Sequence, residues 1–218
     1  SGVAVFFACS PEAGKAGNKI VATARERGME PILDFRLNKH SHPLYNWLDR
    51  RALYRWIQKN PVDIIHCHLN NDHDIASGPA ARLGIPLVRS SYEGLGFPPG
   101  KRMRRLLQAT TALLEPSVMA MQQDIDTFGI DPQRVEVLPG AVDLHRFSPN
   151  PSLPDGRRRL NLPPEAVVIG IVARMQTHRH YEDLFEAMHR LAEEFPSVHL
   201  VVVGRGTHQE KVGFEPVR

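Results

Sequence analysis

Residues 167–203 read VVIGIVARMQTHRHYEDLFEAMHRLAEEFPSVHLVVV and carry the strongest structural signal in the chain. Both ends are apolar runs rich in β-branched residues, a pattern typical of strands that are buried on both faces of a sheet. Between them, apolar side chains recur three and four positions apart, as on one face of a helix. They are Tyr181, Leu184, Phe185, Met188, Leu191, Ala192 and Phe195. Strand, helix and strand in this order predict a βαβ unit with a right-handed crossover.

The same alternation of strand and helix patterns extends upstream. Further strand-like runs are Val3–Cys9, Ile32–Phe35, Val62–Cys67, Pro86–Ser90, Thr111–Leu114 and Arg134–Leu138. A short helix is expected near Asn18–Arg27, and a second helical stripe consists of Leu44, Trp47, Leu48, Leu53, Trp56 and Ile57. We therefore predict an α/β fold, a Rossmann-like parallel sheet with helices on both faces.

A change of composition divides the chain. Residues 147–164 are rich in Pro, Ser and Asn, which is typical of a linker. We predict a first Rossmann-like domain at 1–148, a linker at 149–164, and the beginning of a second domain at 165–218. We expect the first domain to lack its first strand unit, because no Gly-rich turn follows the opening strand. We expect the second to be truncated, because two strands do not make a stable domain.

Overall composition excludes several classes of protein. The 218 residues include 27 basic and 24 acidic side chains, a net charge of +3, which is too weak a bias to indicate nucleic-acid binding. The only cysteines, Cys9 and Cys67, do not indicate a disulfide framework, so a reducing cytoplasm is expected. No apolar run approaches the ~20 residues needed to span a bilayer, and the first ten residues lack the basic start of a signal peptide.

The segment Val172–Ala187 combines a strand end, a polar turn and a helix start. Ligands of open α/β sheets bind beyond the carboxyl ends of the strands, and a helix N-terminus favours an anion. Arg174 and Arg179 flank this point, and arginine binds phosphate oxygens through two parallel hydrogen bonds. The segment suits a diphosphate; the alternative is that both arginines are solvated loop charges.

This segment resembles the second-domain signature of retaining, nucleotide-sugar-dependent glycosyltransferases of the GT-B fold, the family-four-like members of glycosyltransferase group one. The pattern G-R-L-x-x-x-K-G-x-x-x-L-I-E-A maps without gaps onto Ala173–Ala187, with Arg174 on its Arg and Arg179 on its Lys. Three other stretches agree in order and spacing. They are PVDIIHCH at 61–68, RVEVLPGAVDLHRFSP at 134–149 and HLVVVGRG at 199–206.

The resemblance implies a function and a set of site residues. Arg174 and Arg179 would be catalytic and would bind the donor diphosphate together with His180 and Tyr181; the acceptor or sugar cleft would include His68, Tyr92, Glu93 and Gly140. The enzyme would move a hexose from a UDP- or GDP-sugar to a glycan or lipid-linked acceptor hydroxyl with retention, in glycan or lipopolysaccharide biosynthesis. It would need no cofactor and no metal. It would be cytoplasmic, with peripheral contact to the inner face of the membrane, and this truncated chain alone would be inactive.

The sequence departs from the family pattern at four positions. Ala173 and His180 stand where the pattern has Gly, Gly140 stands for its Asn, and Tyr92 replaces a cleft His. These departures keep two alternatives open, a sugar-nucleotide epimerase of the same fold and a non-catalytic nucleotide-sugar-binding domain. A spacing match to the family's E-x7-E motif, at Glu186 and Glu194, falls in the wrong helix and is interpreted as coincidence.

Two further clusters have competing interpretations. The first could suggest a metal site: His66, His68, Asp72, His73 and Asp74. H-x-H is not a specific zinc spacing, so cleft or core histidines are favoured. The second is the basic run 101–105, KRMRR, which is a solvated helix face or a site for anionic lipid headgroups.

Overall fold

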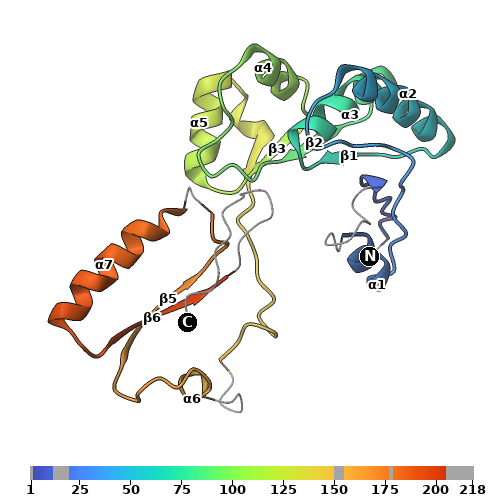
Figure 1. Cartoon of the computed structure of the whole chain (residues 1–218). Helices are drawn as coiled ribbons and strands as arrows, with labels where there is room; N and C mark the ends of the chain where they lie inside the picture. The colour runs from blue at the N-terminus through green and yellow to red at the C-terminus, as the bar shows by residue number, and fades with distance from the viewer. Residues whose placement is uncertain (1, 12–19, 150–154, 177–178, 205–218) are drawn as a thin grey trace. The chain divides into compact units, whose positions relative to one another are not determined.

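The computed structural model describes residues 2–11, 20–149, 155–176 and 179–204 (Figure 1). The chain divides into two compact units, Ser1–Val142 and Asp143–Arg218. Unit 1 contains α1 (Ile20–Glu26), α2 (Pro43–Lys59), β1 (Ile65–Cys67), α3 (Asn70–Leu83), β2 (Leu87–Ser90), α4 (Lys101–Gln108), β3 (Ala112–Glu115), α5 (Val118–Phe128), the 3-10 turn η2 (Pro132–Arg134) and β4 (Val135–Val137). Unit 2 contains α6 (Gly156–Arg159), β5 (Val167–Val172), α7 (Tyr181–Glu194) and β6 (Val198–Val203).

Unit 1 is built on a four-stranded sheet in the order β1-β2-β3-β4, and every neighbouring pair is parallel. Helices α3, α4 and α5 each connect one strand to another along the chain, as parallel pairing requires. The α/β, Rossmann-like fold class predicted from the apolar runs is confirmed.

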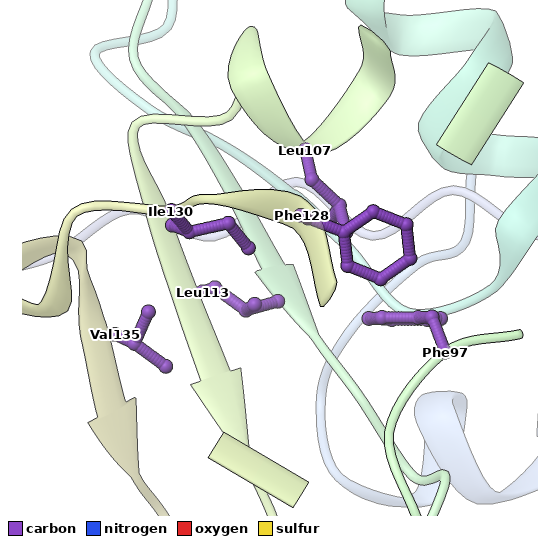
Figure 2. Packing of buried hydrophobic residues seen from close by; sticks show 6 residues of the cluster. All are labelled: Phe97, Leu107, Leu113, Phe128, Ile130 and Val135. Atoms are coloured by element: carbon purple, nitrogen blue, oxygen red, sulfur yellow. The ribbon is translucent and has the colours of Figure 1, made fainter. Parts of the chain in front are cut away.

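The core of unit 1 lies on one face of this sheet. Strand side chains alternate between faces, so Cys67, Leu87, Leu113 and Val135 point to the same side, where all four are buried. Figure 2 shows the larger cluster on that side: Phe97, Leu107, Leu113, Phe128, Ile130 and Val135. A second cluster of Cys67, Ala76, Ala80 and Leu87 lies under α3. On the opposite face, Val88, Ala112 and Leu114 remain only half-buried.

Local signals in the sequence fix where the helices end. Gly84 follows α3 and Gly129 follows α5, both with φ of +67°, and the amide of each donates to a carbonyl of its helix. Only glycine adopts this left-handed conformation without strain, so the two residues terminate their helices. At the other end of α5, the Ser117 hydroxyl accepts from the Ala120 amide.

The prediction of strands at Val3–Cys9 and Ile32–Phe35 is wrong. Within the described residues, Val3–Cys9 and Ile32–Phe35 meet only at an isolated parallel bridge, Ala8 to Ile32. Two backbone hydrogen bonds hold this bridge. The Ile32 amide donates to the Phe7 carbonyl (2.7 Å), and the Cys9 amide donates to the Ile32 carbonyl (3.2 Å). Pro11 and Pro31 flank the bridge and lack the N–H that a longer ladder needs.

Unit 2 is described by itself. Strands β5 and β6 pair in parallel through six residue pairs, from Val167 with Val198 to Val172 with Val203. Helix α7 joins them, so the βαβ unit predicted from residues 167–203 is confirmed. Among the residues that the structure describes, neither outer edge of this two-stranded sheet has a partner strand. Val172, at the end of β5, is 82% exposed.

Helix α2 is attached to α3 largely by polar groups. The Asn46 amide donates to Asn71 Oδ1 at 2.7 Å, and the Arg50 guanidinium forms an ion pair of 2.5 Å with Asp74. Asp49, on the same inner side, accepts from the amides of Arg36 (3.1 Å) and Leu37 (2.9 Å).

No helix in the described part of the chain has both the length and the apolar character to cross a membrane.

Candidate functional site

Unit 1 gathers polar side chains at one edge of its sheet. Because β1 to β4 are parallel, their carboxyl ends meet at the same edge (Figure 1). Ligands of open α/β sheets bind at that edge. His68 follows β1, Tyr92 and Glu93 follow β2, and Gly140 follows β4.

His68 and Tyr92 are in direct contact. His68 Nδ1 lies 2.7 Å from the Tyr92 hydroxyl, and the two rings stack with centroids 6.1 Å apart. The position of His68 is fixed by Asp72, which accepts from the amides of His68 (3.1 Å) and Leu69 (2.9 Å) at the start of α3. Tyr92, which stands at the position of the family's cleft His, is thus hydrogen-bonded to His68 at the end of the neighbouring strand β1.

His66 lies beside this pair. Its ring centroid is 4.4 Å from that of His68, as period-two alternation along a strand predicts, and its Nε2 lies 2.8 Å from Ser90 Oγ. Burial, followed by the charge of His68, lowers the pKa of His66. Among the described residues, no three His, Cys, Asp or Glu side chains are grouped closely enough to hold a metal ion. Hydrogen bonds to Ser90 and Tyr92 account for one ring nitrogen each of His66 and His68.

Glu93 and Gly140 are placed at the sheet edge without joining the histidine pair. Glu93 is exposed, and its amide donates to Ser91 Oγ at 3.3 Å. Gly140 is also exposed, and a side chain added there would meet nothing within 4 Å. Glycine is therefore not required at position 140 by packing within the described residues.

Arg89 is a buried cation beneath this edge that the sequence did not reveal. Only 3% of its surface is exposed. Its Nη2 donates to Asn70 Oδ1 at 2.8 Å, and its guanidinium lies 5.4 Å from the centre of the Phe97 ring. Its Nε and Nη1 have no hydrogen-bond partner among the described residues. Its Nη1 also lies 3.8 Å from Asp72 Oδ1, so the buried guanidinium is paired with a carboxylate that also accepts the His68 amide.

Two buried carboxyl groups, Glu115 at the end of β3 and Asp124 on α5, lie beneath the same loop, and neither is exposed. Asp124 accepts from the Phe97 amide at 2.8 Å, and a side chain at Gly96 would lie 2.5 Å from Asp124 Oδ1. Burial, followed by Asp124, raises the pKa of Glu115 to about 8. The sequence signal was a glutamate in the otherwise apolar strand ALLE at 112–115.

Unit 2 places Arg174 directly after β5. A hollow of about 480 Å³ at the carboxyl ends of β5 and β6 is lined by Val172, Ala173, Arg174, Val203 and Gly204. The backbones approach closely there, because a side chain at Gly204 would lie 1.9 Å from the Ala173 carbonyl oxygen. The side chain of Arg174 is exposed at this opening.

The turn that leads into α7 contains the other donor-side candidates. Arg179 is exposed, and its amide donates to the Gln176 carbonyl at 2.9 Å. His180 has φ 51° and ψ 51°, and its side chain makes no capping bond to α7. The Tyr181 ring is buried and its hydroxyl donates to the Ala173 carbonyl at 3.2 Å, which ties the helix start to the strand end. His178, a polar residue of the same turn, lies outside the described residues.

The left-handed backbone of His180 gives a physical reason for the glycine in the family pattern. A residue with a side chain is disfavoured in this region, although histidine is tolerated better than most.

The two glutamates that match the E-x7-E spacing, Glu186 and Glu194, both lie in α7, and Glu186 forms an ion pair with Arg190 one turn later.

Sequence comparisons give the family context of this geometry. The model of Glycosyltransferase Family 4 matches residues 1–146. A D-inositol 3-phosphate glycosyltransferase of Kineococcus radiotolerans is 29% identical over 148 residues, 62% of this chain and 34% of the relative. A UDP-Gal:alpha-D-GlcNAc-diphosphoundecaprenol alpha-1,3-galactosyltransferase of Escherichia coli is 27% identical over 169 residues, 71% of this chain and 43% of the relative. The matched part is thus less than half the length of these curated relatives.

Solved structures share the fold at low sequence identity. A glycosyltransferase from Rickettsia africae has a TM-score of 0.64 and 13% identity, over 88% of this chain and 58% of that one. Anabaena HepE, in complex with UDP and glucose, has a TM-score of 0.60 and 15% identity, over 87% and 52%. A proposed UDP-N-acetylglucosamine 2-epimerase from Listeria monocytogenes has a TM-score of 0.55 and 16% identity, over 83% and 51%. These likenesses confirm the expected GT-B-type fold.

Proposed function

The chain belongs to Glycosyltransferase Family 4, as its motifs predicted, and from this premise we propose that it takes part in moving a sugar from a nucleoside diphosphate sugar to an acceptor hydroxyl. Unit 1 contributes the acceptor side and unit 2 contributes part of the donor side. The neighbouring HepE structures hold UDP, UDP-glucose, or UDP and glucose, so the donor proposed here is a UDP-sugar. No cofactor or metal is proposed.

The donor proposal depends on one observation, the hollow at the carboxyl ends of β5 and β6 with Arg174 at its opening. Negative charge develops on the departing diphosphate as the glycosidic bond breaks. Arg174 and Arg179, with the amides at the start of α7, would stabilise that charge before it forms, which is the main advantage of preorganised charges. We propose that transfer retains the anomeric configuration, as the motif at Ala173–Ala187 implies.

The acceptor proposal depends on the bond between His68 and Tyr92. When the Tyr92 hydroxyl donates to His68 Nδ1, the proton of the neutral imidazole is on Nε2. His68 can then donate from Nε2 to an oxygen of the sugar or acceptor. The E. coli relative is named for a diphosphoundecaprenol-linked acceptor, and a glycan or lipid-linked acceptor is proposed here. A cytoplasmic location is proposed because Cys9 and Cys67 are free thiols.

The epimerase alternative has weaker support. The fold of the Listeria structure is shared, but the family model that covers residues 1–146 describes glycosyltransferases. Release of UDP that depends on an added acceptor identifies a transferase. Interconversion of the UDP-sugar without an acceptor identifies an epimerase.

The donor site is tested by titrating this chain with UDP, GDP and ADP in a calorimeter. We expect UDP to bind, and Arg174→Gln to weaken it by roughly tenfold or more, because a hydrogen bond to a charged group contributes about 1.5–3 kcal/mol. Arg158→Gln is the matched control, since the Arg158 side chain is 91% exposed on α6. Equal UDP affinity in the parent chain and in Arg174→Gln would contradict the assignment.

A further inference from the structure

The loop that follows β2 carries two of the acceptor-side candidates, Tyr92 and Glu93. We call residues 91–97 the β2 loop. It begins as a continuation of the sheet, because the Ser91 amide donates to the Leu114 carbonyl at 2.8 Å. Within the loop, the Glu93 amide donates to Ser91 Oγ at 3.3 Å. The start of the β2 loop is therefore fixed by the sheet.

The other end of the β2 loop is fixed from α5. Phe97 is buried in the larger core cluster (Figure 2), and its amide donates to Asp124 Oδ1 at 2.8 Å. Gly96, with φ 77°, passes so close to the same carboxylate that a side chain there would lie 2.5 Å from Asp124 Oδ1. Asp124 thus bonds to the loop backbone from outside the loop, whereas Ser91 bonds to it from within.

Asp124 occupies a position of α5 that faces the core. The buried residues of this helix are Ala120, Asp124 and Phe128, which recur every four residues and so lie on one side. Asp124 has no exposed surface. A buried carboxyl group is costly even when it is partly hydrogen-bonded, and an apolar side chain of similar size would avoid that cost. Core stability alone therefore does not account for an aspartate at this position.

A second carboxyl group adds to this cost. Glu115, at the end of β3, is also fully buried, and burial, followed by Asp124, raises its pKa. Arg89, the nearby cation on β2, opposes that shift only in part. Neither oxygen of Glu115 and only one oxygen of Asp124 has a hydrogen-bond partner among the described residues. Carboxyl groups that are buried together at the expense of stability are enriched at functional sites, which indicates a role for Asp124 beyond packing.

The contact between Tyr92 and His68 depends on where the β2 loop is held. Tyr92 is 66% exposed, so water competes for the 2.7 Å hydrogen bond between its hydroxyl and His68 Nδ1. One exposed hydrogen bond is too weak to order a loop against its conformational entropy. Breaking the buried bond from Phe97 to Asp124 would instead leave a buried amide and a buried carboxylate without a partner, which costs much more. The buried bond therefore sets the loop, and the exposed bond follows from it.

We propose that Asp124 is a positioning residue of the acceptor side, which holds the β2 loop in the conformation that brings Tyr92 to His68. The inference rests on the proposed function for what the acceptor side does, but the geometry can be measured without a reaction. The feature of Asp124 that is required is the acceptor oxygen at Oδ1 and not the charge. Asp124→Asn keeps such an oxygen, whereas Asp124→Ala removes it.

Nuclear magnetic resonance of the histidine rings tests the proposal. Proton–nitrogen correlation spectra at about pH 7.5, where imidazoles are mostly neutral, report which ring nitrogen holds the proton and whether the other accepts a hydrogen bond. The His68 signals are assigned by their absence in His68→Gln, and Tyr92→Phe supplies the reference for a broken contact. We expect Asp124→Ala to shift the His68 Nδ1 signal to its position in Tyr92→Phe. Asp124→Asn should leave that signal at its position in the parent chain.

A second variant reaches the same contact from the loop. Gly96→Ala would place its Cβ 2.5 Å from Asp124 Oδ1, so it should displace the loop and shift the His68 signal as Asp124→Ala does. In both variants, the amides of residues 92–97 should exchange with solvent at least about tenfold faster than in the parent chain, because a hydrogen bond to a charged group is lost.

The matched control is Asp126→Ala. Asp126 is an exposed carboxylate on α5 that accepts from Gln122 at 3.0 Å and makes no bond to the β2 loop. Its removal should leave the His68 signal and the exchange of the loop amides unchanged. Circular dichroism of each variant checks that the fold is retained.

Three results would overturn the proposal. One is a parent chain whose His68 signal already lies at its position in Tyr92→Phe. Another is a His68 signal that stays at the parent position in folded Asp124→Ala and folded Gly96→Ala. The third is an equal shift in Asp124→Asn and Asp124→Ala, because the charge and not the acceptor oxygen would then be required. Failure of the parent chain to bind UDP would contradict the proposed donor site and would leave the result at His68 as it is.

Discussion

At the scale of single residues, His180 is where the chain departs most clearly from its family. Its backbone is left-handed, with φ 51°, directly before a helix that is proposed to bind phosphate. The family pattern has glycine there, and glycine adopts this conformation freely. The departure therefore adds strain and also places a side chain beside the exposed amides of α7.

His180→Gly should relieve both effects. We expect the midpoint of thermal unfolding to rise slightly, since a left-handed non-glycine residue costs roughly 1–2 kcal/mol, part of which is offset by the greater entropy of unfolded glycine. UDP affinity should rise as well. Asn161→Gly is the control, because Asn161 has φ 53° in the same unit but lies outside the donor segment. A fall in both stability and affinity in His180→Gly would show that the imidazole itself is needed.

Which site residues could be predicted depended on their position in the chain. The family resemblance implied that His68 and Tyr92 belong to one cleft, and in the structure the two side chains are 2.7 Å apart. Arg89 and Asp124 were missed, because each has polar neighbours in the sequence, so the local pattern does not mark either of them as buried. In the structure, Arg89 contacts Asn70, Asp72 and the Phe97 ring, and Asp124 accepts the Phe97 amide.

At the scale of elements, the apolar runs predicted the paired strands well and the unpaired ones badly. The run at Val198–Val203 became β6 with the predicted bounds. Val3–Cys9 has a similar composition but forms a single bridge. A run of β-branched residues shows that the sequence is compatible with a strand. A ladder also needs a neighbouring strand with free amides. Pro31, next to Ile32, and Pro11, two residues after Cys9, have no amide N–H to donate.

The junction between β5 and β6 gives a prediction about glycine. Gly204→Ala would place its Cβ 1.9 Å from the Ala173 carbonyl oxygen, so the strand ends must move apart. We expect unit 2 to lose about 1–3 kcal/mol of stability to this overpacking and UDP binding to weaken. Urea unfolding followed by circular dichroism measures the first effect. Gly170→Ala is the control, because a side chain there meets nothing within 4 Å, and a variant of Gly204 as stable as this control would refute the close approach.

At the scale of the whole molecule, buried titratable groups set how stability depends on pH. The pKa of Glu115 is raised from 4.5 to about 8. Between these two pH values, the folded state therefore binds more protons than the unfolded state. Stability should therefore fall as pH rises toward 8. Burial lowers the pKa of His73 to about 4, which has the opposite effect, but only below the unfolded value near 6.5.

The window between pH 6.5 and 8 therefore isolates the buried carboxyl pair. In that window we expect the free energy of unfolding to fall by at most about 1.4 kcal/mol per pH unit. Glu115→Gln should flatten the profile, whereas Glu136→Gln, which changes an exposed carboxylate on β4, should keep the slope. Denaturant unfolding at a series of pH values measures this. An unchanged slope in Glu115→Gln would show that another group titrates.

The two-stranded sheet of unit 2 also bears on how the protein behaves at high concentration. The segments VVIGIV and VHLVVV contain no Asp, Glu, Lys, Arg or Pro and have high β propensity, which is the composition of segments that form cross-β fibrils. Three of their four end valines, Val167, Val172 and Val203, are more than half exposed. The strands that hold Arg174 at the proposed donor site are therefore also the part of unit 2 best suited to start aggregation.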